Sequence, residues 1–377
     1  MNVLFHLGHP AHFHLFRHTI TRLREAGHIV HILVKKKDVL TRLLDEAGLP
    51  YVNILPEGRS PGRTGMVRDL FKRGRRLIAY AAKHRPDLLI GTSADISYAG
   101  KWLVIPAINV NEDDASVIPL HAWLAYPWAT VILSPECCDN GRWNRKTVTY
   151  PGYHELAYLH PDHFSPDFNV VKRYIDALNP YEVAASHGIP GGASPKKHEA
   201  NSVAPYFVLR LSALTAHHDR GIRGISDEIV DRLVRVLEPH GRVLISSERP
   251  LDRKFYPFIM RIKPEDMHHM LAFAGAVIGD SQTMSAEAGV LGTPFIRYND
   301  FVGKIGYLRE LEDTYRLGFG ISPGNPDLLV ARAEELASME SRDIFQERRR
   351  RMLSEKINVV DYLFDYITGF SNHNSRM

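Results

Sequence analysis

The sequence has 377 residues, of which 44% are hydrophobic and 24% charged, and its net charge is +4 with histidine neutral. This length suits two domains of about 150–200 residues rather than one. No apolar run approaches the roughly 20 residues that span a bilayer, and the first residues read as a strand rather than a signal peptide. The two cysteines, Cys137 and Cys138, are adjacent, which excludes a disulfide framework and gives no metal-ligand spacing. We therefore expect a cytoplasmic protein.

Basic residues gather in three places, and the net charge is too mild to predict a nucleic-acid partner. The clusters are 35–37, 68–76 and 348–351. Solvated helix faces are the common explanation of such clusters, and contact with a phosphorylated substrate or with the inner face of an anionic membrane is the other.

The chain opens with a predicted βαβ unit. Strands are expected at 2–7 and 28–34, with a loop from Gly8 to His14 and a helix from Leu15 to Ala26 between them. The loop follows the first strand, at the sheet edge where open α/β folds bind ligands. Because the loop is not a GxGxxG turn, no dinucleotide cofactor is expected.

Three histidines surround this loop: His9, His12 and His14. Their spacing does not suit a helical metal pair. A histidine there could be a general base, since its ordinary pKa is near neutrality. His9 and His12 are the better candidates, because His14 is expected to point along the helix.

The rest of the first half predicts an α/β domain over residues 1–155. Helices are expected at 39–47 and 66–84, and strands at 51–55, 87–90, 105–110 and 130–133, the last of which closes the sheet. Asp95 and Glu112 follow two of these strands, so both are expected in the same crevice as the first loop, unless they are ordinary solvated loop acids.

Residues 156–205 are rich in proline and glycine and predict a linker with a mobile segment near 187–201. A second domain, 206–342, is expected to follow, with strands at 206–211 and 242–246 and helices at 225–237 and 265–274. His217 and His218 lie in the polar exit of its first strand. Residues 343–377 predict a C-terminal helix and tail.

The stretch from Val277 to Ile296 organises this second domain. It predicts a buried strand, a polar turn, a short helix and another strand. Free N–H groups at a helix start bind anions, and Ser281, Gln282 and Thr283 would add side-chain donors there. Glu287, one turn further along, could accept both hydroxyls of a ribose. The alternative is a capped helix with a solvated glutamate.

These motifs resemble the GT-B fold of nucleotide-sugar glycosyltransferases and of non-hydrolysing UDP-N-acetylglucosamine 2-epimerases. More closely, the chain resembles a prokaryotic GT-B-like family, domain of unknown function 354. The segments that carry the resemblance are Gly8–His12, Pro151–Leu159, Arg210 with Ala216–Asp219, and Gly279–Thr283. The resemblance implies two Rossmann-like domains facing across a cleft, with a C-terminal helix returning to the first domain.

The resemblance also implies roles for individual residues. Ser281, Gln282 and Thr283 would hold the diphosphate of the donor, together with Arg210, and Glu287 would hold its ribose. Residues 263–267 fall where such proteins contact the base. His9 or His12 would deprotonate an unknown acceptor, which lipid-linked glycan synthesis could supply. Neither a metal nor a cofactor is needed, since the nucleotide-sugar, expected to be a UDP-sugar, is the substrate.

The comparison with the epimerases implies a second function. Asp95, Glu112 and either His217 or His218 match the positions of the acid/base groups that move the proton at C2 of the sugar. The residues after the histidine are His-Asp-Arg-Gly here, which departs from the epimerase pattern. A third alternative is a catalytically silent protein that binds a sugar nucleotide.

Overall fold

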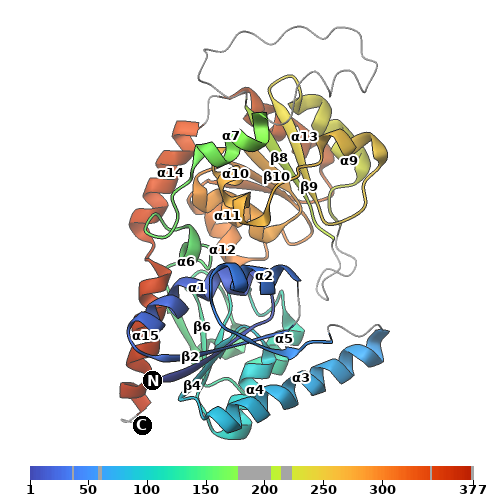
Figure 1. The fold of residues 1–377 in the computed structure, drawn as a ribbon. Coiled ribbons are helices and arrows are strands. Elements are labelled where there is room, and N and C mark those ends of the chain that lie inside the picture. The colour runs from blue at the N-terminus through green and yellow to red at the C-terminus, as the bar shows by residue number, and fades with distance from the viewer. Residues whose placement is uncertain (36–37, 58–61, 177–204, 214–222, 340–341, 375–377) are drawn as a thin grey trace. The chain divides into compact units, whose positions relative to one another are not determined.

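The computed structural model describes residues 1–35, 38–57, 62–176, 205–213, 223–339 and 342–374 (Figure 1). The chain forms two compact units. Unit 1 comprises Met1–His163, Ile305–Tyr307 and Glu355–Met377, and unit 2 comprises Phe164–Lys304 and Leu308–Ser354.

Unit 1 is built on a parallel sheet of seven strands in the order β3-β2-β1-β4-β5-β6-β7. The strands are β1 (Asn2–Leu7), β2 (Ile29–Lys35), β3 (Val52–Leu55), β4 (Leu88–Gly91), β5 (Ala107–Val110), β6 (Val131–Pro135) and β7 (Thr147–Tyr150). The strand order reverses between β1 and β4. The prediction that 130–133 closes the sheet was wrong, because β7 pairs with β6 at that edge. Its sequence, Thr-Val-Thr-Tyr, is half polar, as suits an edge strand.

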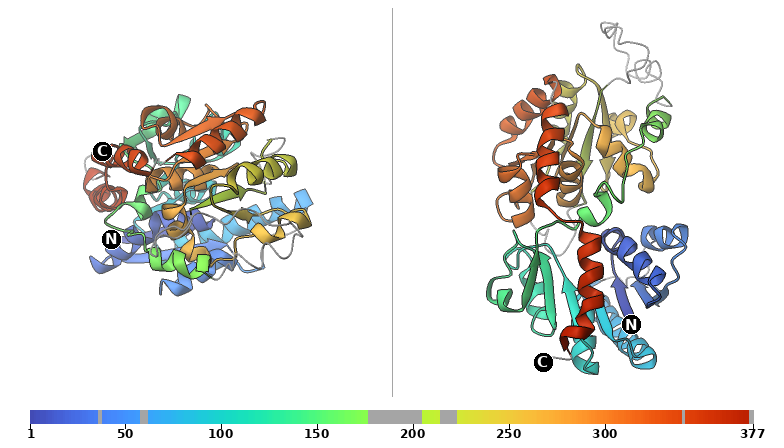
Figure 2. Two further views of the ribbon diagram at one scale, coloured as in Figure 1. Left: turned by 90° about the horizontal axis from the view of Figure 1, so that it is seen from above. Right: turned by 90° about the vertical axis from the view of Figure 1, so that its left-hand side faces the viewer.

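Helices cover both faces of this sheet. Right-handed crossovers put helices that connect strands in one direction on one face and those that connect them in the other direction on the opposite face. On one face α1 (Pro10–Glu25) packs against α2 (Asp38–Glu46), α6 (Leu156–Leu159) and α15 (Val359–Asn374). On the other, α3 (Gly62–His84) packs against α4 (Ala94–Leu103), and α4 against α5 (Pro119–Ala125) (Figure 2). The core between these layers is aliphatic, with Leu4, Leu33 and Leu89 fully buried.

The C-terminal helix α15 belongs to unit 1, as expected. Asp361 forms an ion pair with Arg22 of α1, and the Arg22 guanidinium lies 4.2 Å from the ring centre of Phe364. The chain therefore ends against the domain in which it began.

The first helix begins earlier than the sequence predicts. α1 starts at Pro10, so the expected loop from Gly8 to His14 is only two residues long. Proline suits the first helical position because its φ is preset and its missing N–H would have no partner there. His9 is the N-cap, and its side chain accepts a hydrogen bond from Ala11 N. His12 and His14 consequently lie on the helix.

Unit 2 has a parallel sheet of five strands in the order β12-β11-β10-β8-β9. The strands are β8 (Tyr206–Leu211), β9 (Arg242–Ser247), β10 (Ala276–Gly279), β11 (Phe295–Tyr298) and β12 (Gly318–Ile321). This is the doubly wound order 2-1-3-4-5, which reverses between its first and third strands, here β8 and β10.

The helices of unit 2 also divide between two faces. α9 (Asp227–Leu237) packs on α13 (Pro326–Ser338), whereas α10 (Met267–Phe273) packs on α11 (Gln282–Leu291) and on α7 (Phe168–Asp176). The remaining short elements are η2 (Arg253–Phe258), η3 (Pro264–Asp266), α12 (Gly306–Arg309), which begins in unit 1, and η4 (Glu310–Thr314). The helix α14 (Arg342–Glu355) ends at the boundary with unit 1. Within 156–205, the segment expected to be a linker, the described part contains α6 and α7.

A buried ion pair connects β11 to η4 in unit 2. Arg297 is fully buried and its Nε donates to Glu312 Oε1 at 2.9 Å, while its Nη2 donates to the other carboxylate oxygen at 3.0 Å. Burial raises the pKa of Glu312, and the neighbouring guanidinium opposes that rise. Across the described ranges, no helix has both the length and the apolar character needed to cross a membrane.

Candidate functional site

The predicted nucleotide turn lies at the point where the strand order of unit 2 reverses. β10 is hydrogen-bonded to β8, and α11 begins immediately after β10. Ser281 is the N-cap of α11, and its Oγ accepts from Met284 N at 3.4 Å. Gln282 and Thr283 form the first turn. In open α/β sheets this crevice is where ligands bind, and the N-terminus of the helix adds free N–H donors.

A buried carboxylate that the sequence reasoning treated only as a turn residue holds this crevice together. Asp280 Oδ1 accepts from Ser212 N at 2.6 Å, and Oδ2 accepts from Ile225 N at 3.3 Å. Burial raises the pKa of Asp280, and these backbone hydrogen bonds oppose the rise. Asp280 thereby fixes the exit of β8 to the end of β10. The sequence feature that could have identified Asp280 as a site residue is its position directly after a buried strand.

Glu287, the predicted ribose ligand, is buried on α11 rather than solvated. Its Oε1 lies 3.1 Å from His268 Nε2 on α10, and both residues are less than a tenth exposed. Phe164 contacts the His268 ring edge-on, with 6.0 Å between the ring centres. The carboxylate is therefore held in one orientation. Sequence reasoning missed His268 because the two residues are 19 positions apart on different helices.

Arg210, next to the last residue of β8, pairs with Gly279 at the end of β10, beside the same turn. A Cβ at Gly279 would lie 2.5 Å from the Arg210 carbonyl oxygen, so only glycine fits the end of β10. The Arg210 side chain points to β9, where Nη1 donates to Ser246 Oγ at 2.7 Å and Nη2 to the carboxylate of Glu248. Its positive charge is thus already paired in this state.

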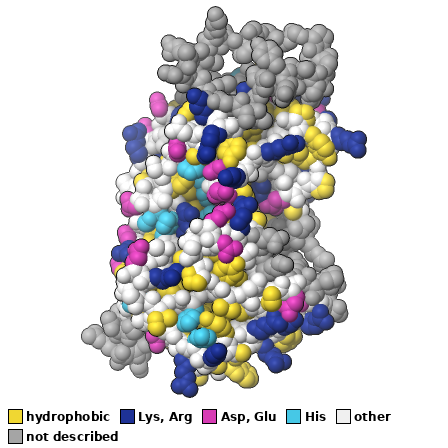
Figure 3. Space-filling view, viewed as in Figure 1, with side chains coloured by type: hydrophobic (Ala, Val, Ile, Leu, Met, Phe, Trp, Pro, Cys, Tyr) yellow, Lys and Arg dark blue, Asp and Glu magenta, His cyan; other side chains and the backbone are white. Residues whose placement is uncertain are grey.

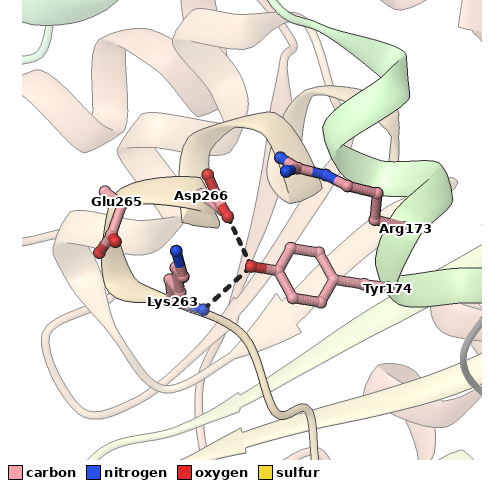
Figure 4. A pocket seen from close by; sticks show the side chains of 5 residues that line it. All are labelled: Arg173, Tyr174, Lys263, Glu265 and Asp266. Carbon is pink, nitrogen blue, oxygen red and sulfur yellow. Dashed lines mark hydrogen bonds between the residues drawn. The ribbon is translucent and has the colours of Figure 1, made fainter.

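A pocket of about 200 Å³ lies in unit 2 beside the start of α10 (Figure 4). It is lined by Arg173, Tyr174, Lys263, Glu265 and Asp266. The Tyr174 hydroxyl donates to Asp266 Oδ2 and accepts from Lys263 N. These two hydrogen bonds connect α7 to the segment before α10. Three of these five residues fall in the predicted base-contacting segment 263–267.

In unit 1, histidines gather where the strand order reverses between β1 and β4. Gly8 N donates to His12 Nδ1 at 3.1 Å, and Thr92 Oγ1 lies 2.8 Å from His12 Nε2. His6 Nδ1 lies 2.7 Å from Ser93 Oγ, and its Nε2 is buried with no hydrogen-bond partner among the described residues. His6 was not predicted, because a histidine inside a strand reads as an ordinary core residue.

Burial keeps these rings neutral. It lowers the pKa of His6 to about 4, against the attraction of Asp95. The pKa of His12 lies well below 6.5 because the ring is desolvated, and His9, His6 and Lys35 depress it further. Since Nδ1 of His12 accepts a backbone N–H, the proton of its neutral ring is on Nε2, which is therefore a donor in this state. His9 Nδ1 likewise accepts from Ala11 N, which leaves its Nε2 as a donor.

The two predicted acids lie on the same edge but have different partners. Asp95 is buried in the first turn of α4, and its Oδ2 accepts from Arg73 Nε at 2.6 Å. Glu112 Oε2 accepts from His154 N at 3.2 Å and lies 3.4 Å from His154 Nδ1. Burial lowers the pKa of His154 to about 4, with Glu155 and Asp113 opposing. His154 lies within the segment 151–159, and the sequence predicted no role for it.

The structure thus assembles two sets of residues. His9, His12, Asp95 and Glu112 share the carboxyl edge of the sheet in unit 1, and Arg210, Ser281, Gln282, Thr283 and Glu287 gather around the β8–β10 crevice in unit 2. His217 and His218 lie outside the described residues. In the part of the chain that the structure describes, no group of three or more His, Cys, Asp or Glu side chains could hold a metal ion.

No family model and no curated protein matches the chain, but solved structures do. S. aureus MnaA with UDP has a TM-score of 0.67 at 11% identity, covering 98% of this chain and 97% of that one. UDP-GlcNAc 2-epimerase from Methanocaldococcus jannaschii, in complex with UDP-GlcNAc and UDP, scores 0.58 at 14% identity, covering 94% and 99%. The spinosyn forosaminyltransferase SpnP scores 0.59 at 16% identity, covering 99% and 98%.

These similarities show the fold. The chain consists of two Rossmann-like domains of the kind shared by nucleotide-sugar 2-epimerases and GT-B glycosyltransferases, over nearly its whole length. Fold alone does not choose between the reactions of these proteins.

Proposed function

We propose that this protein is a metal-independent glycosyltransferase that uses a nucleotide-diphosphate sugar, expected to be a UDP-sugar, in making a cell-surface glycan or glycolipid. The observation that carries the proposal is the geometry of α11: a serine-capped N-terminus at the β8–β10 crevice, followed by a buried glutamate that His268 holds. The four quoted motifs favour membership of the family called domain of unknown function 354.

In this proposal unit 2 binds the donor. The diphosphate takes the N–H groups at the start of α11 with Ser281 and Thr283, where the helix dipole favours negative charge. Glu287 accepts the ribose hydroxyls, and the base lies near 263–267. Arg210 assists the departing diphosphate once the phosphate displaces its partner Glu248.

Unit 1 would act on the acceptor. A neutral imidazole is the form that can take a proton, and the lowered pKa of His12 supplies it at neutral pH. To act as a base, the His12 ring must accept a proton at Nε2. The ring proton must therefore move first from Nε2 to Nδ1, and the hydrogen bond that Gly8 N donates to Nδ1 must break. Substrate binding would drive this change. The other role for His9 and His12 is to donate Nε2–H to the sugar or diphosphate.

A UDP-sugar 2-epimerase is the second candidate, favoured by the two carboxylates at the ends of β4 and β5. Asp95 forms an ion pair with Arg73, whose charge balances that of the carboxylate. Glu112 faces His154, whose ring can exchange a proton. Epimerisation needs no acceptor, whereas transfer does. Incubating a UDP-sugar with the protein alone, and following C2 inversion by NMR, separates the two reactions.

Calorimetric titration with UDP, GDP, CMP and dTDP tests the donor site. We expect one nucleotide to bind tightly and Glu287→Ala to weaken it about 100-fold, since two hydrogen bonds to a charged group contribute roughly 1.5 kcal/mol or more each. Glu334→Ala, on the exposed side of α13, is the control and should bind as the wild type does. If no nucleotide binds, the start of α11 is only a capped helix and the proposal fails.

A further inference from the structure

Exposed apolar side chains cover the outer side of α4 and α5 in unit 1. Trp102 is 78% exposed, Val104 90% and Trp123 57%. We call this set the aromatic patch; its members are Tyr98, Trp102, Val104, Leu120, Trp123, Leu124 and Trp128. Three of the four tryptophans in the chain belong to it. Soluble proteins seldom gather large apolar side chains on one surface unless the surface binds something.

Helix packing and ring contacts connect the elements that carry the aromatic patch. The rings of Tyr98 on α4 and Trp128 after α5 are 6.0 Å apart, and α4 packs against α5. Trp123 meets the buried Trp143 edge-on at 6.1 Å. Trp143 lies on η1 (Gly141–Lys146), so this short helix adjoins the patch.

Cations flank the aromatic patch. The Arg142 guanidinium lies 4.4 Å from the ring centre of Trp123, a cation–π contact. Lys146 binds the carbonyl oxygens of Pro127 and Ala129 beside Trp128. Arg142, Arg145 and Lys146 lie on η1, and Lys101 lies in the last turn of α4, next to Trp102. Burial lowers the pKa of Lys146, and the positive charges of Arg145 and Lys101 lower it further.

Acidic residues do not balance this charge. No acidic residue occurs from Ala115 to Pro135, the segment that contains α5. Asp139, two residues before η1, accepts hydrogen bonds from Gly141 N and Asn144 Nδ2 of that helix. The neighbouring helix α3 carries further basic residues, but Lys72 and Arg76 pair with Glu57 and Arg73 pairs with Asp95. Figure 3 shows Lys and Arg side chains gathered over this helix at the lower right.

Val104 carries backbone strain that a glycine at this helix cap would avoid. It is the C-cap of α4 with φ 57° and ψ 38°, the left-handed region. For a β-branched residue this conformation costs about 1–2 kcal/mol, and glycine or asparagine would adopt it more easily. Its side chain is almost wholly in solvent, so no core packing compensates. Strain at an exposed apolar residue points to a function for that side chain.

We propose that the aromatic patch docks unit 1 on an anionic lipid surface. Tryptophan is suited to the membrane interface because its ring is apolar and its N–H is polar. Lys101, Arg142, Arg145 and Lys146 supply the attraction to acidic headgroups. A second copy of the chain fits less well, since a two-fold interface would oppose these cations to themselves.

Vesicle co-sedimentation of the full-length protein tests this inference, which does not depend on the sugar-nucleotide proposal. We expect binding to vesicles of one part phosphatidylglycerol to three parts phosphatidylcholine, and little binding to phosphatidylcholine alone. Binding should weaken with salt. Lys101→Gln with Arg145→Gln should weaken it about 25-fold, from roughly fivefold for each cation near an anionic surface.

Substituting the apolar residues tests whether the aromatic side chains of the patch enter the lipid interface. Trp102→Gln with Trp123→Gln should weaken vesicle binding at least about tenfold, because each ring loses a buried apolar area in the interface. Tyr256→Gln in unit 2, where Tyr256 is 53% exposed, is the matched control and should leave binding unchanged. Val104→Asn should maintain or raise the melting temperature yet weaken binding, which a purely structural residue would not do.

Three results would overturn the proposal. They are equal binding to neutral and anionic vesicles, no vesicle binding by the wild type, and tryptophan variants that bind as the wild type does. Sedimentation velocity tests the other candidate partner, a second copy of the chain. A concentration-dependent dimer that Trp102→Gln dissociates would assign the aromatic patch to that copy instead.

Discussion

The two units share a sheet architecture but place different side chains where the strand order reverses. Each has a parallel sheet whose strand order reverses once, at β1–β4 in unit 1 and at β8–β10 in unit 2. In unit 2 this crevice holds carboxylates with fixed partners and a serine-capped helix. In unit 1 it holds His6, His9 and His12, two of which have pKa values well below the ordinary range.

In the proposed function, this difference assigns binding to unit 2 and proton transfer to unit 1. A buried carboxylate held by a neighbour, like Glu287 against His268, offers hydrogen bonds in a fixed direction, which suits recognition of sugar hydroxyls. A neutral imidazole can both give and take a proton, which suits chemistry. The shared architecture provides the location, and the residue types at the strand ends decide the task.

The largest expected effect is on turnover and comes from unit 1. His12→Ala, or His9→Ala if that ring is the one that acts, should lower kcat/KM for transfer by about 10² to 10⁴ while leaving nucleotide affinity unchanged, because general base catalysis contributes that much. Because His12 stays neutral, the acid limb of the pH profile should lie well below pH 6.5.

Glutamine at the same position decides which role the ring has. Its amide can replace an Nε2–H donor but cannot accept a proton. If His12→Gln is as inactive as His12→Ala, the ring is a base, whereas recovery of activity would make it a donor. His31→Ala, a half-buried histidine in β2, should leave turnover unchanged.

The next effect is on stability and compares two buried aspartates. Asp280→Ala leaves two backbone N–H groups without acceptors and should lower the free energy of unfolding by about 3 kcal/mol. Asp114 in unit 1 is its counterpart, accepting from Asp139 N at 2.9 Å and Gly306 N at 2.6 Å. Denaturant titration should give similar losses for both variants, with nucleotide binding reduced only for Asp280→Ala. Equal nucleotide affinity in both would remove Asp280 from the site.

Acid should destabilise the protein through the histidines of unit 1. Burial lowers the pKa of His6, His121 and His154 to about 4 each. Below the unfolded value of 6.5 the unfolded chain takes up protons that the folded chain does not, so stability is full above pH 6.5 and falls until about pH 4. Between pH 7 and pH 6 three such groups contribute a loss of about 2 kcal/mol. Denaturation midpoints that are flat across this range would contradict these shifts.

The sequence predicted the strands and helices better than it predicted the contacts between side chains. The apolar runs gave most strands, and the 277–296 unit appears as expected, because buried strands and capped helices have local signatures. α4 and α5 were not predicted, because the charge-free segment around α5 lacks the polar spacing of an amphipathic helix. Partners such as Glu287–His268 and Glu112–His154 cannot be predicted locally, since only the packing of separate elements brings them together.

The smallest effect distinguishes a ligand site from an ordinary helix cap. Ser281 and Ser226 cap α11 and α9 of the same unit, and each Oγ accepts a backbone N–H at 3.4 Å. Replacing either by alanine should lower the free energy of unfolding by about 1 kcal/mol, the usual contribution of an N-cap. Only Ser281→Ala should also weaken nucleotide binding, by roughly tenfold if its hydroxyl contacts phosphate. Matched stability losses with unchanged affinity in both variants would reduce Ser281 to a cap, and donor binding would then rest on Glu287 and the backbone N–H groups of α11.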